Sequence, residues 1–334
     1  MSRANTTSRP VLSIVIPTVS DTAALERTLV SVLENRPAAT EIVVPLGCDY
    51  ADPWNIREEV RFVQAPAGAG LVGCTNLGIA ASTAPLIHVL AAGLRATPGW
   101  TDRPVERLAS GAAAVVPLGI AADSPARIVS AGIGLSRGGR RIDLAPSGRC
   151  RRHDDLDPAT LVPAGPTLEA GFWRADVLAV AGPGFPAACG DSHADADLAA
   201  ALASLGAPVV LEPESRVVWS TPRQPIGAFA AGNLAERVFW RSLARGSLVT
   251  RLAAHAVEVA RDSIVRAPLG TLPMLAGRFA AFLQYGDHVA RVRRLRAVAR
   301  QAEEAERPTL RIDDPHHAIR PRGRVSTPAL KRSA

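Results

Sequence analysis

The amino-acid sequence predicts an α/β protein with a doubly wound, mostly parallel sheet and a helical extension behind it. Short apolar runs rich in β-branched residues alternate with segments of helical periodicity up to about residue 220, which is the pattern of a parallel sheet covered by helices on both faces. Beyond residue 222 only helical periodicity continues. A chain of 334 residues with 47% hydrophobic composition can bury one large core, with or without a smaller helical appendage.

The elements of the first half follow from their apolar pattern. Residues 11–16, VLSIVI, form a continuous apolar run that ends at Pro17, as expected of a strand buried on both faces. Residues 22–34 have helical apolar spacing, and Asp21 or Thr22 can cap this helix. Further elements are expected in this order: strands at residues 41–44 and 60–63, a helix at 76–81, and strands at 86–90 and 112–116.

The second half is expected to mix short strands with helices and then to become entirely helical. Residues 130–152 are rich in Gly and Arg, which indicates a surface hairpin or a flexible insertion. The remaining elements are predicted as helices at residues 174–180, 195–205, 226–244, 248–264 and 271–302, and strands at 208–211 and 216–219. We therefore expect three parts: an α/β domain over residues 1–222, a helical extension over 223–306 and a basic, disordered tail over 307–334.

The positive charge is concentrated toward the C-terminus. Residues 251–334 carry 16 basic and 8 acidic side chains, a net charge of +8, whereas residues 1–250 carry 22 and 23, a net charge of −1. A nucleic-acid-binding protein would carry basic charge on its body, so no nucleic-acid partner is expected. The last predicted helix presents either a solvated basic face or a contact for an anionic membrane surface, formed by Arg291, Arg293, Arg294, Arg296 and Arg300.

Three features of the sequence bear on location and redox state. The chain has no run of about 18 uncharged apolar residues, and its first ten residues lack the apolar stretch of a secretory signal. Its four cysteines form no Cys-x-x-Cys pair, so they are expected to be reduced thiols. We expect a cytoplasmic protein. The basic C-terminus also allows peripheral association with the membrane.

Several landmarks occur in a fixed order between about residues 10 and 220. They are the first strand with Pro17-Thr18, the segment 69–81 with Asn76-Leu-Gly, Pro98-Gly-Trp100, Glu169-Ala-Gly-Phe-Trp-Arg174, and Asp195-Ala-Asp-Leu198. This ordered set resembles the family-2 glycosyltransferases of the GT-A fold. The resemblance implies a nucleotide-sugar donor whose diphosphate is held by Mg²⁺ or Mn²⁺, and a glycan acceptor.

The positions that carry chemistry in that family depart from its pattern. The metal-binding Asp-x-Asp pair corresponds to Ala91 and Gly93, and the acid that binds the nucleotide base corresponds to Pro45. Three further acids or metal ligands of the family are replaced, by Pro186, Ala194 and Trp219. Ala and Gly offer no side-chain oxygen to a hard cation, so no metal site is expected. Losing such stabilisation of the leaving diphosphate costs on the order of several powers of ten in rate.

Two acids and one arginine remain as candidates for catalysis. Asp195 corresponds to the family's general base, which takes the proton from the acceptor hydroxyl, and Asp197 lies beside it. Both acids also suit the first turn of a helix, where they would favour the helix dipole, and the sequence leaves these two roles open. Arg95 could supply the positive charge of the missing metal, or it could be an arginine of a solvated loop.

The presumed donor crevice lies at the carboxyl ends of the strands, where doubly wound sheets bind ligands. Asp49 and Asp52 either replace the missing base-binding acid or belong to a turn ahead of Pro53. Gly70 permits close approach to phosphate, and Asn76 is expected to close a helix-to-strand contact. The resemblance places these positions along the crevice: Pro17, Thr18, Pro45, Asp49, Gly70, Asn76, Ala91, Gly93 and Arg95.

Two functions remain open. The first is a glycosyltransferase-like protein linked to polysaccharide or glycolipid assembly, in which metal-dependent transfer is impaired or lost and which acts beside partner glycosyltransferases. The alternative is an active inverting glycosyltransferase with a metal-independent donor site and Asp195 as general base. A nucleotide sugar with Mg²⁺ or Mn²⁺ is expected only if the donor site is functional.

Overall fold

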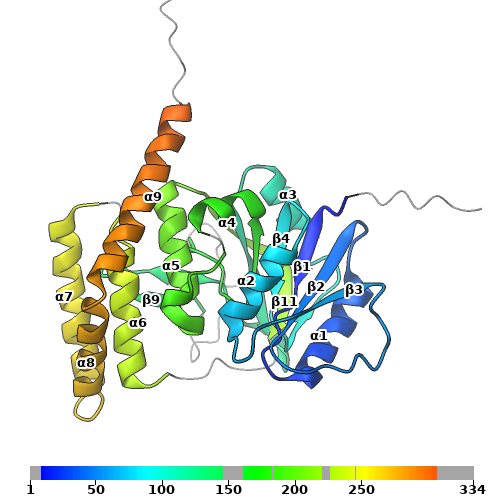
Figure 1. Ribbon diagram of the computed structural model, residues 1–334, viewed down its shortest axis with the longest axis horizontal. Helices are drawn as coiled ribbons and strands as arrows, with labels where there is room; N and C mark the ends of the chain where they lie inside the picture. Colours follow the sequence, from blue (N-terminus) through cyan, green and yellow to red (C-terminus); the bar gives the residue numbers. More distant parts are fainter. Residues whose placement is uncertain (1–8, 146–160, 183, 220–225, 245, 307–334) are drawn as a thin grey trace, which may run out of the picture.

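The computed structural model describes residues 9–145, 161–182, 184–219, 226–244 and 246–306 (Figure 1). Within them the chain forms a nine-stranded sheet with helices on both faces, and further helices lie to one side. The predicted α/β class is confirmed. The sheet is parallel where the sequence pattern was clearest, and antiparallel strands are added in its second half.

The first half of the sheet is parallel. β1 (Leu12–Val15) pairs with β2 (Thr40–Leu46) and β4 (Leu86–Leu90), and β2 pairs with β3 (Val60–Gln64). Every residue of β1 and β4 is buried, which accounts for their continuous apolar runs. The connecting helices are α1 (Thr22–Asn35), α2 (Leu71–Ala81) and α3 (Asp102–Ala109).

The second half of the sheet departs from the predicted elements. β10 (Ala170–Arg174) lies antiparallel between β4 and β6 (Ala114–Ala121). The two strands predicted at residues 208–219 are one strand, β11 (Val209–Trp219), whose register shifts between Glu212 and Arg216. β5 (Leu94–Ala96) pairs with β11, and β7 (Ser124–Ser130) pairs with β6. The full strand order is β3-β2-β1-β4-β10-β6-β11-β5, with β7 paired to β6. None of β5, β7 and β10 was predicted, because their sequences lack a clear alternating pattern.

The Gly- and Arg-rich stretch contains the expected hairpin. β8 (Ile133–Leu135) pairs antiparallel with β9 (Arg141–Asp143). Residues 146–152, which belong to the same predicted segment, lie outside the described residues. The hairpin packs against α5 (Gly190–Leu205), a helix that begins well before the predicted start at residue 195.

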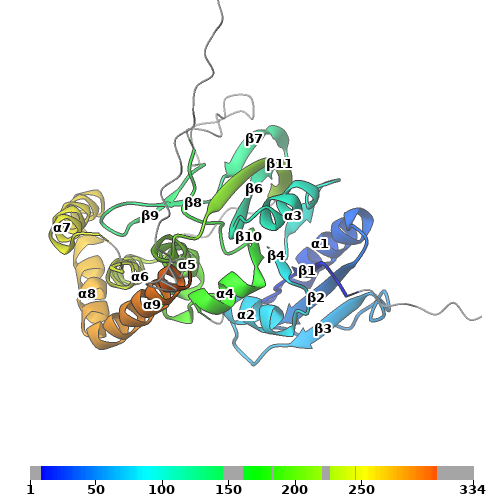
Figure 2. The same cartoon turned by 90° about the horizontal axis from the view of Figure 1, so that it is seen from above.

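Helices follow the sheet to the end of the described chain. They are α4 (Ala175–Ala181), α6 (Ala228–Arg241), α7 (Leu248–Val265), α8 (Thr271–Phe282) and α9 (Tyr285–Glu306). The single helix predicted at residues 271–302 is therefore two helices. α6 and α9 pack against α5, whereas α7 and α8 lie at the outer side of the molecule (Figure 2). In the described part of the chain, no helix is both long and apolar enough to cross a membrane.

Two apolar clusters fill the faces of the sheet. One joins the strands to α1 and α3, and the other joins them to α2, α4 and α5. Leu295 of α9 belongs to the second cluster and is 1% exposed. The boundaries at residues 222 and 306 stay predictions, and residues 307–334 of the expected tail lie outside the described residues.

Candidate donor and acceptor site

The turn after β4 carries Ala91 and Gly93, the positions of the missing metal ligands. Three successive amides of this turn are bound within the protein: Ala91 N donates to Glu169 O (2.8 Å), Ala92 N to Pro17 O (3.2 Å) and Gly93 N to Thr28 Oγ1 (2.9 Å). Gly93 has a φ of 98°, a conformation that favours glycine. The turn thus offers a diphosphate neither a carboxylate-held metal nor any of these three amides. Over the described residues, no group of three or more His, Cys, Asp or Glu side chains could hold a metal ion.

The corner between β1 and β2 is closed by backbone hydrogen bonds. Thr18 N donates to Pro45 O at 3.0 Å, and Gly47 N donates to Thr18 O at 2.8 Å. Thr18 is fully buried, and Pro45 is also buried. β2 extends to Leu46, so Pro45 lies inside the strand and not in the loop after it. This corner therefore packs as an extension of the sheet.

The two acids behind β2 have different surroundings. Asp49 is exposed. Asp52 is 8% exposed, accepts a hydrogen bond from Ile56 N at 3.2 Å and lies 3.4 Å from the Arg57 guanidinium. Asp52 thus holds the turn locally, as one of the two sequence interpretations expects. Asp49 stays the candidate for contact with a nucleotide base.

The N-terminus of α2 is occupied by an acid from α5. The Asp191 carboxylate accepts hydrogen bonds from Leu71 N at 2.9 Å and Val72 N at 2.8 Å. A Cβ on Gly70 would lie 2.5 Å from this carboxylate. Gly70 does allow a close approach, but the group that approaches is Asp191. Because helix N-termini bind anions through these same amides, Asp191 fills the place that a phosphate would take.

Asn76 does not make the expected helix-to-strand contact. Its side chain holds a turn instead. Its amide donates to Phe185 O at 2.8 Å, and its oxygen accepts from Phe185 N at 2.6 Å. A Cβ on Gly184 would lie 2.3 Å from the Asn76 oxygen. Asn76 therefore fixes the chain that leads into α5.

Arg95 lies in the strand β5. The alternative that placed it in a loop is therefore wrong. It is exposed and pairs in register with Val218 of β11. Leu94 and Ala96 on either side of it are buried. The Arg95 side chain therefore points away from the core on a short strand directly after the Ala91–Gly93 turn.

Asp195 is enclosed by an arginine from the β8–β9 hairpin. Arg141 donates to both carboxylate oxygens of Asp195, from Nε at 2.9 Å and from Nη2 at 2.8 Å. The side chains are 7% and 0% exposed for Arg141 and Asp195. Burial acts to lower the pKa of Arg141, but the charges of Asp195 and Asp143 outweigh it and raise that pKa. The guanidinium thus stays charged, in the two-point geometry that makes such pairs strong.

Asp197 is enclosed by the C-terminal helices. Its carboxylate accepts from Arg241 Nε at 2.6 Å and from Arg291 Nε at 3.2 Å, and its side chain is fully buried. Cys189 lies 3.7 Å away through its sulfur, and burial, followed by the charge of Asp197, raises the pKa of that thiol well above its ordinary value. Asp197 connects α5 to α6 and α9.

Neither acid lies in the first turn of its helix, so the capping role that the sequence left open is wrong. α5 begins at Gly190, and the acid of its first turn is Asp191. Asp195 and Asp197 lie in the body of the helix. The sequence analysis missed Arg141, Arg241 and Arg291 as their partners. The expectation that Arg291 belongs to a solvated or membrane-facing basic surface is wrong, because its side chain is 11% exposed and is held by the buried Asp197. For Arg141 the only signal was its place in the Gly- and Arg-rich stretch.

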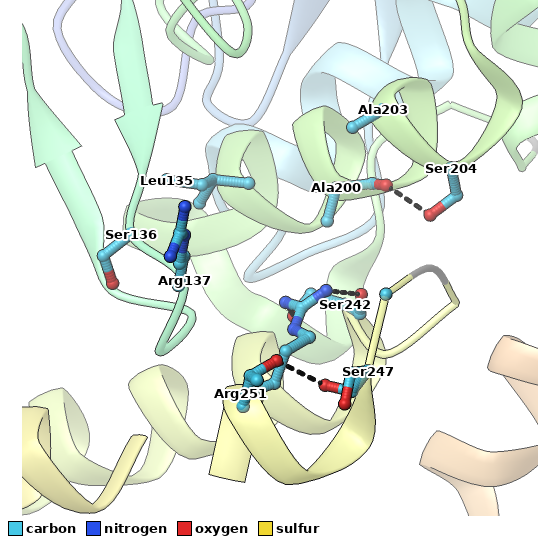
Figure 3. A pocket seen from close by; sticks show the side chains of 11 residues that line it. Leu135, Ser136, Arg137, Ala200, Ala203, Ser204, Ser242, Ser247 and Arg251 are labelled. Carbon is cyan, nitrogen blue, oxygen red and sulfur yellow. Dashed lines mark hydrogen bonds between the residues drawn. The ribbon is translucent and has the colours of Figure 1, made fainter. Parts of the chain in front are cut away.

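A pocket of about 380 Å³ lies apart from these positions, between the β8–β9 hairpin, α5 and the start of α7 (Figure 3). Its lining includes Arg137, Ser204 and Arg251. The Arg251 guanidinium donates to Ser242 O at 2.9 Å and to Ser242 Oγ at 2.6 Å. None of the site residues expected from the sequence lines this pocket.

Comparison with solved structures places the fold. A mannosyltransferase from Pyrobaculum calidifontis, solved with GDP-Man and Mn²⁺, is similar over 90% of this chain and 88% of its own, with a TM-score of 0.52 and 16% identity. TarS of S. aureus is similar over 88% and 92%, with a TM-score of 0.54 and 12% identity. GalNAc-T7 with UDP, GalNAc and Mn²⁺ is similar over 75% and 54%, with a TM-score of 0.51 and 16% identity.

The chain therefore has the GT-A fold of glycosyltransferases. No protein-family model matches its sequence, and no curated protein matches it. The likeness is one of fold, and a fold does not by itself define an activity.

Proposed function

We propose that this protein is a glycosyltransferase-like component of polysaccharide or glycolipid assembly in which metal-dependent sugar transfer is lost. In this proposal the GT-A fold serves as a binding module beside active glycosyltransferases. The observation that carries the proposal is the enclosure of Asp195, the acid that the resemblance assigns as general base, by Arg141. A carboxylate that accepts two hydrogen bonds from a buried guanidinium is a poor proton acceptor, because protonation would leave the arginine unpaired.

The donor side supports the same proposal. At three places along the expected donor crevice, polar groups are hydrogen-bonded within the protein. These are the Ala91–Gly93 turn, the β1–β2 corner and the N-terminus of α2. A donor would have to displace these contacts without a cation to compensate its charge.

Isothermal titration with uridine, guanosine and thymidine diphosphate sugars, with and without Mn²⁺, tests this proposal. We expect no Mn²⁺-dependent binding of any donor. Tight binding of one donor that requires Mn²⁺ would overturn the proposal. Asp191→Ala is an informative variant, because it frees the amides at the N-terminus of α2. Weak, metal-independent donor binding that appears only in this variant would support the interpretation that Asp191 blocks this helix terminus.

A second candidate is an active inverting glycosyltransferase with a metal-independent donor site. The observation that favours it is Arg95, which is exposed directly after the turn where the metal would lie. This candidate requires product formation from a nucleotide sugar in the presence of EDTA. It also requires that Arg95→Ala and Asp195→Asn each abolish that product. The Arg95→Ala variant should unfold at the same midpoint as the unaltered chain.

A further inference from the structure

Helix α7 has the reverse polarity of an ordinary surface helix. Apart from Arg261, its charged side chains face the protein: His255 Nε2 lies 3.0 Å from Glu236 Oε2, Glu258 pairs with Arg140 at 2.7 Å, and Asp262 pairs with Arg278 at 2.8 Å. No residue of α7 is buried. Its outward positions are apolar instead, with Val257 68% and Ile264 76% exposed.

The apolar surface continues through the connecting turn and along α8. Leu269 is 88% exposed, Leu272 76%, Phe279 64% and Leu283 70%. We name the surface formed by these four side chains with Val257 and Ile264 the α7–α8 face. Between residues 246 and 286, all of which are described, Arg261 is the only exposed charged residue, and the exposed Asp287 follows directly.

A face of this kind is unfavourable in water. Exposed apolar surface costs about 25 cal/mol for each Å² that could be buried, and monomeric proteins rarely expose contiguous apolar patches larger than a few hundred Å². α8 packs its other side closely on α6, where Met274 and Gly277 are buried. The α7–α8 face therefore has the properties of a surface that is covered when the protein functions.

The charge around the face indicates what covers it. Arg261 of α7 is exposed. α9, which begins just after α8, exposes one acid at its start, Asp287, and further along four arginines, Arg293, Arg294, Arg296 and Arg300. Apolar side chains accompanied by arginines are the composition of helices that lie in an anionic lipid interface. A second copy of the chain is the alternative occupant, since a twofold interface pairs the same patch of both copies.

We propose that the α7–α8 face lies in the interface of an anionic membrane, with Leu269 and Leu272 at the turn inserted among the lipids. The inference concerns a surface separate from the donor and acceptor positions and holds whether or not those positions are active. It also moves the expected membrane contact, which the sequence placed on the arginines of the last helix, to the apolar residues of α7 and α8.

Co-sedimentation of the full chain with vesicles tests the proposal. We expect binding to vesicles of phosphatidylglycerol and phosphatidylcholine in equal parts, and much weaker binding to phosphatidylcholine alone. Leu269→Glu with Leu272→Glu should lower binding at least about tenfold, because apolar side chains no longer enter the interface. Arg261→Gln should lower binding to the anionic vesicles about fivefold and leave binding to neutral vesicles unchanged.

Val30→Glu is the matched control, because Val30 is 53% exposed on α1, away from this face. It should bind as the unaltered chain does. All the altered side chains are exposed, so circular dichroism should show unchanged folding. Unchanged vesicle binding by the Leu269→Glu, Leu272→Glu variant overturns the proposal. A second outcome also overturns it: the unaltered chain binds no vesicles, and light scattering shows a dimer that Leu272→Glu dissociates. In that case a second copy of the chain covers the face.

Discussion

At the scale of single residues, the pair Asp195–Arg141 decides how the candidate acceptor site is interpreted. A carboxylate at this place in the sequence suggests proton transfer, whereas a carboxylate bound at both oxygens by a buried guanidinium suggests a structural link between a hairpin and a helix. Removing one partner of such a pair leaves an uncompensated charge in the core, whereas replacing both partners by apolar residues is often neutral.

The pair should therefore show strong coupling in a double-mutant cycle. Arg141→Met is expected to lower the free energy of unfolding by about 3–5 kcal/mol, and Arg141→Met with Asp195→Leu should recover most of this loss. Chemical denaturation measures both. Arg174→Met is the control, since the Arg174–Asp176 pair is on the surface and should contribute at most about 1 kcal/mol. A double variant no more stable than Arg141→Met alone would contradict the structural role.

His88 is a second buried group with a measurable consequence. Its Nδ1 lies 2.8 Å from Gly171 O, its Nε2 accepts from Trp100 Nε1 at 3.1 Å, and its ring stacks on Phe172. Burial lowers the pKa of His88 to about 3, with a smaller opposing effect of the Gly171 carbonyl.

His88 should therefore lower the free energy of unfolding as the pH is lowered. The unfolded chain binds a proton near a pKa of about 6.5, whereas the folded chain does not. The contribution of His88 is thus complete above that pH and is lost as the pH falls toward 3, by about 1.4 kcal/mol for each pH unit. Denaturation at several pH values measures the slope, and His88→Gln should reduce it. An equal slope in the variant would assign the acid sensitivity to other groups.

At the scale of elements, α2 depends on an acid far away in the sequence. The capping bonds from Asp191 to Leu71 N and Val72 N join α2 to α5. Asp191→Ala should lower the free energy of unfolding by about 0.5–2 kcal/mol, the usual effect of losing an N-cap. Asp49→Ala, at an exposed position, is the control and should change it by less than about 0.5 kcal/mol. Equal stability of the two variants would show that the Leu71 and Val72 amides find other hydrogen-bond acceptors when Asp191 is removed.

The same scale shows where prediction from sequence works and where it stops. β1 and β4 were predicted because strands buried on both faces need continuous apolar runs. β10 was missed, although it lies in the centre of the sheet, because its five residues have no distinguishing period. The start of α5 was placed too late, since Asp191 and His193 look like loop residues until their partners are known.

At the scale of the whole molecule, the C-terminal helices are part of the folded body. Leu295 of α9 lies in the core with α2, α4 and α5, and Arg291 reaches Asp197. A chain ending at residue 284 would expose this core and leave one side of Asp197 open. A chain ending at residue 306 would keep all the described contacts of α9.

Truncation should separate these two cases. The chain ending at residue 284 is expected to unfold at a markedly lower temperature, because a buried leucine alone contributes about 2–5 kcal/mol. The chain ending at residue 306 should unfold at the temperature of the full chain. Thermal unfolding followed by circular dichroism measures both, and equal midpoints for all three chains would mean that the helical extension is an independent unit.

The sequence by itself determined the α/β class, the parallel strands and the absence of metal-ligating acids at Ala91 and Gly93, since burial pattern and side-chain chemistry are local properties. Only the tertiary structure decided what surrounds the remaining acids. The arginines that enclose Asp195 and Asp197 come from a hairpin and from two C-terminal helices, and the cap of α2 comes from α5. Such contacts join residues about 40 to 120 positions apart, so no local pattern encodes them, and chain folding alone brings their charges together.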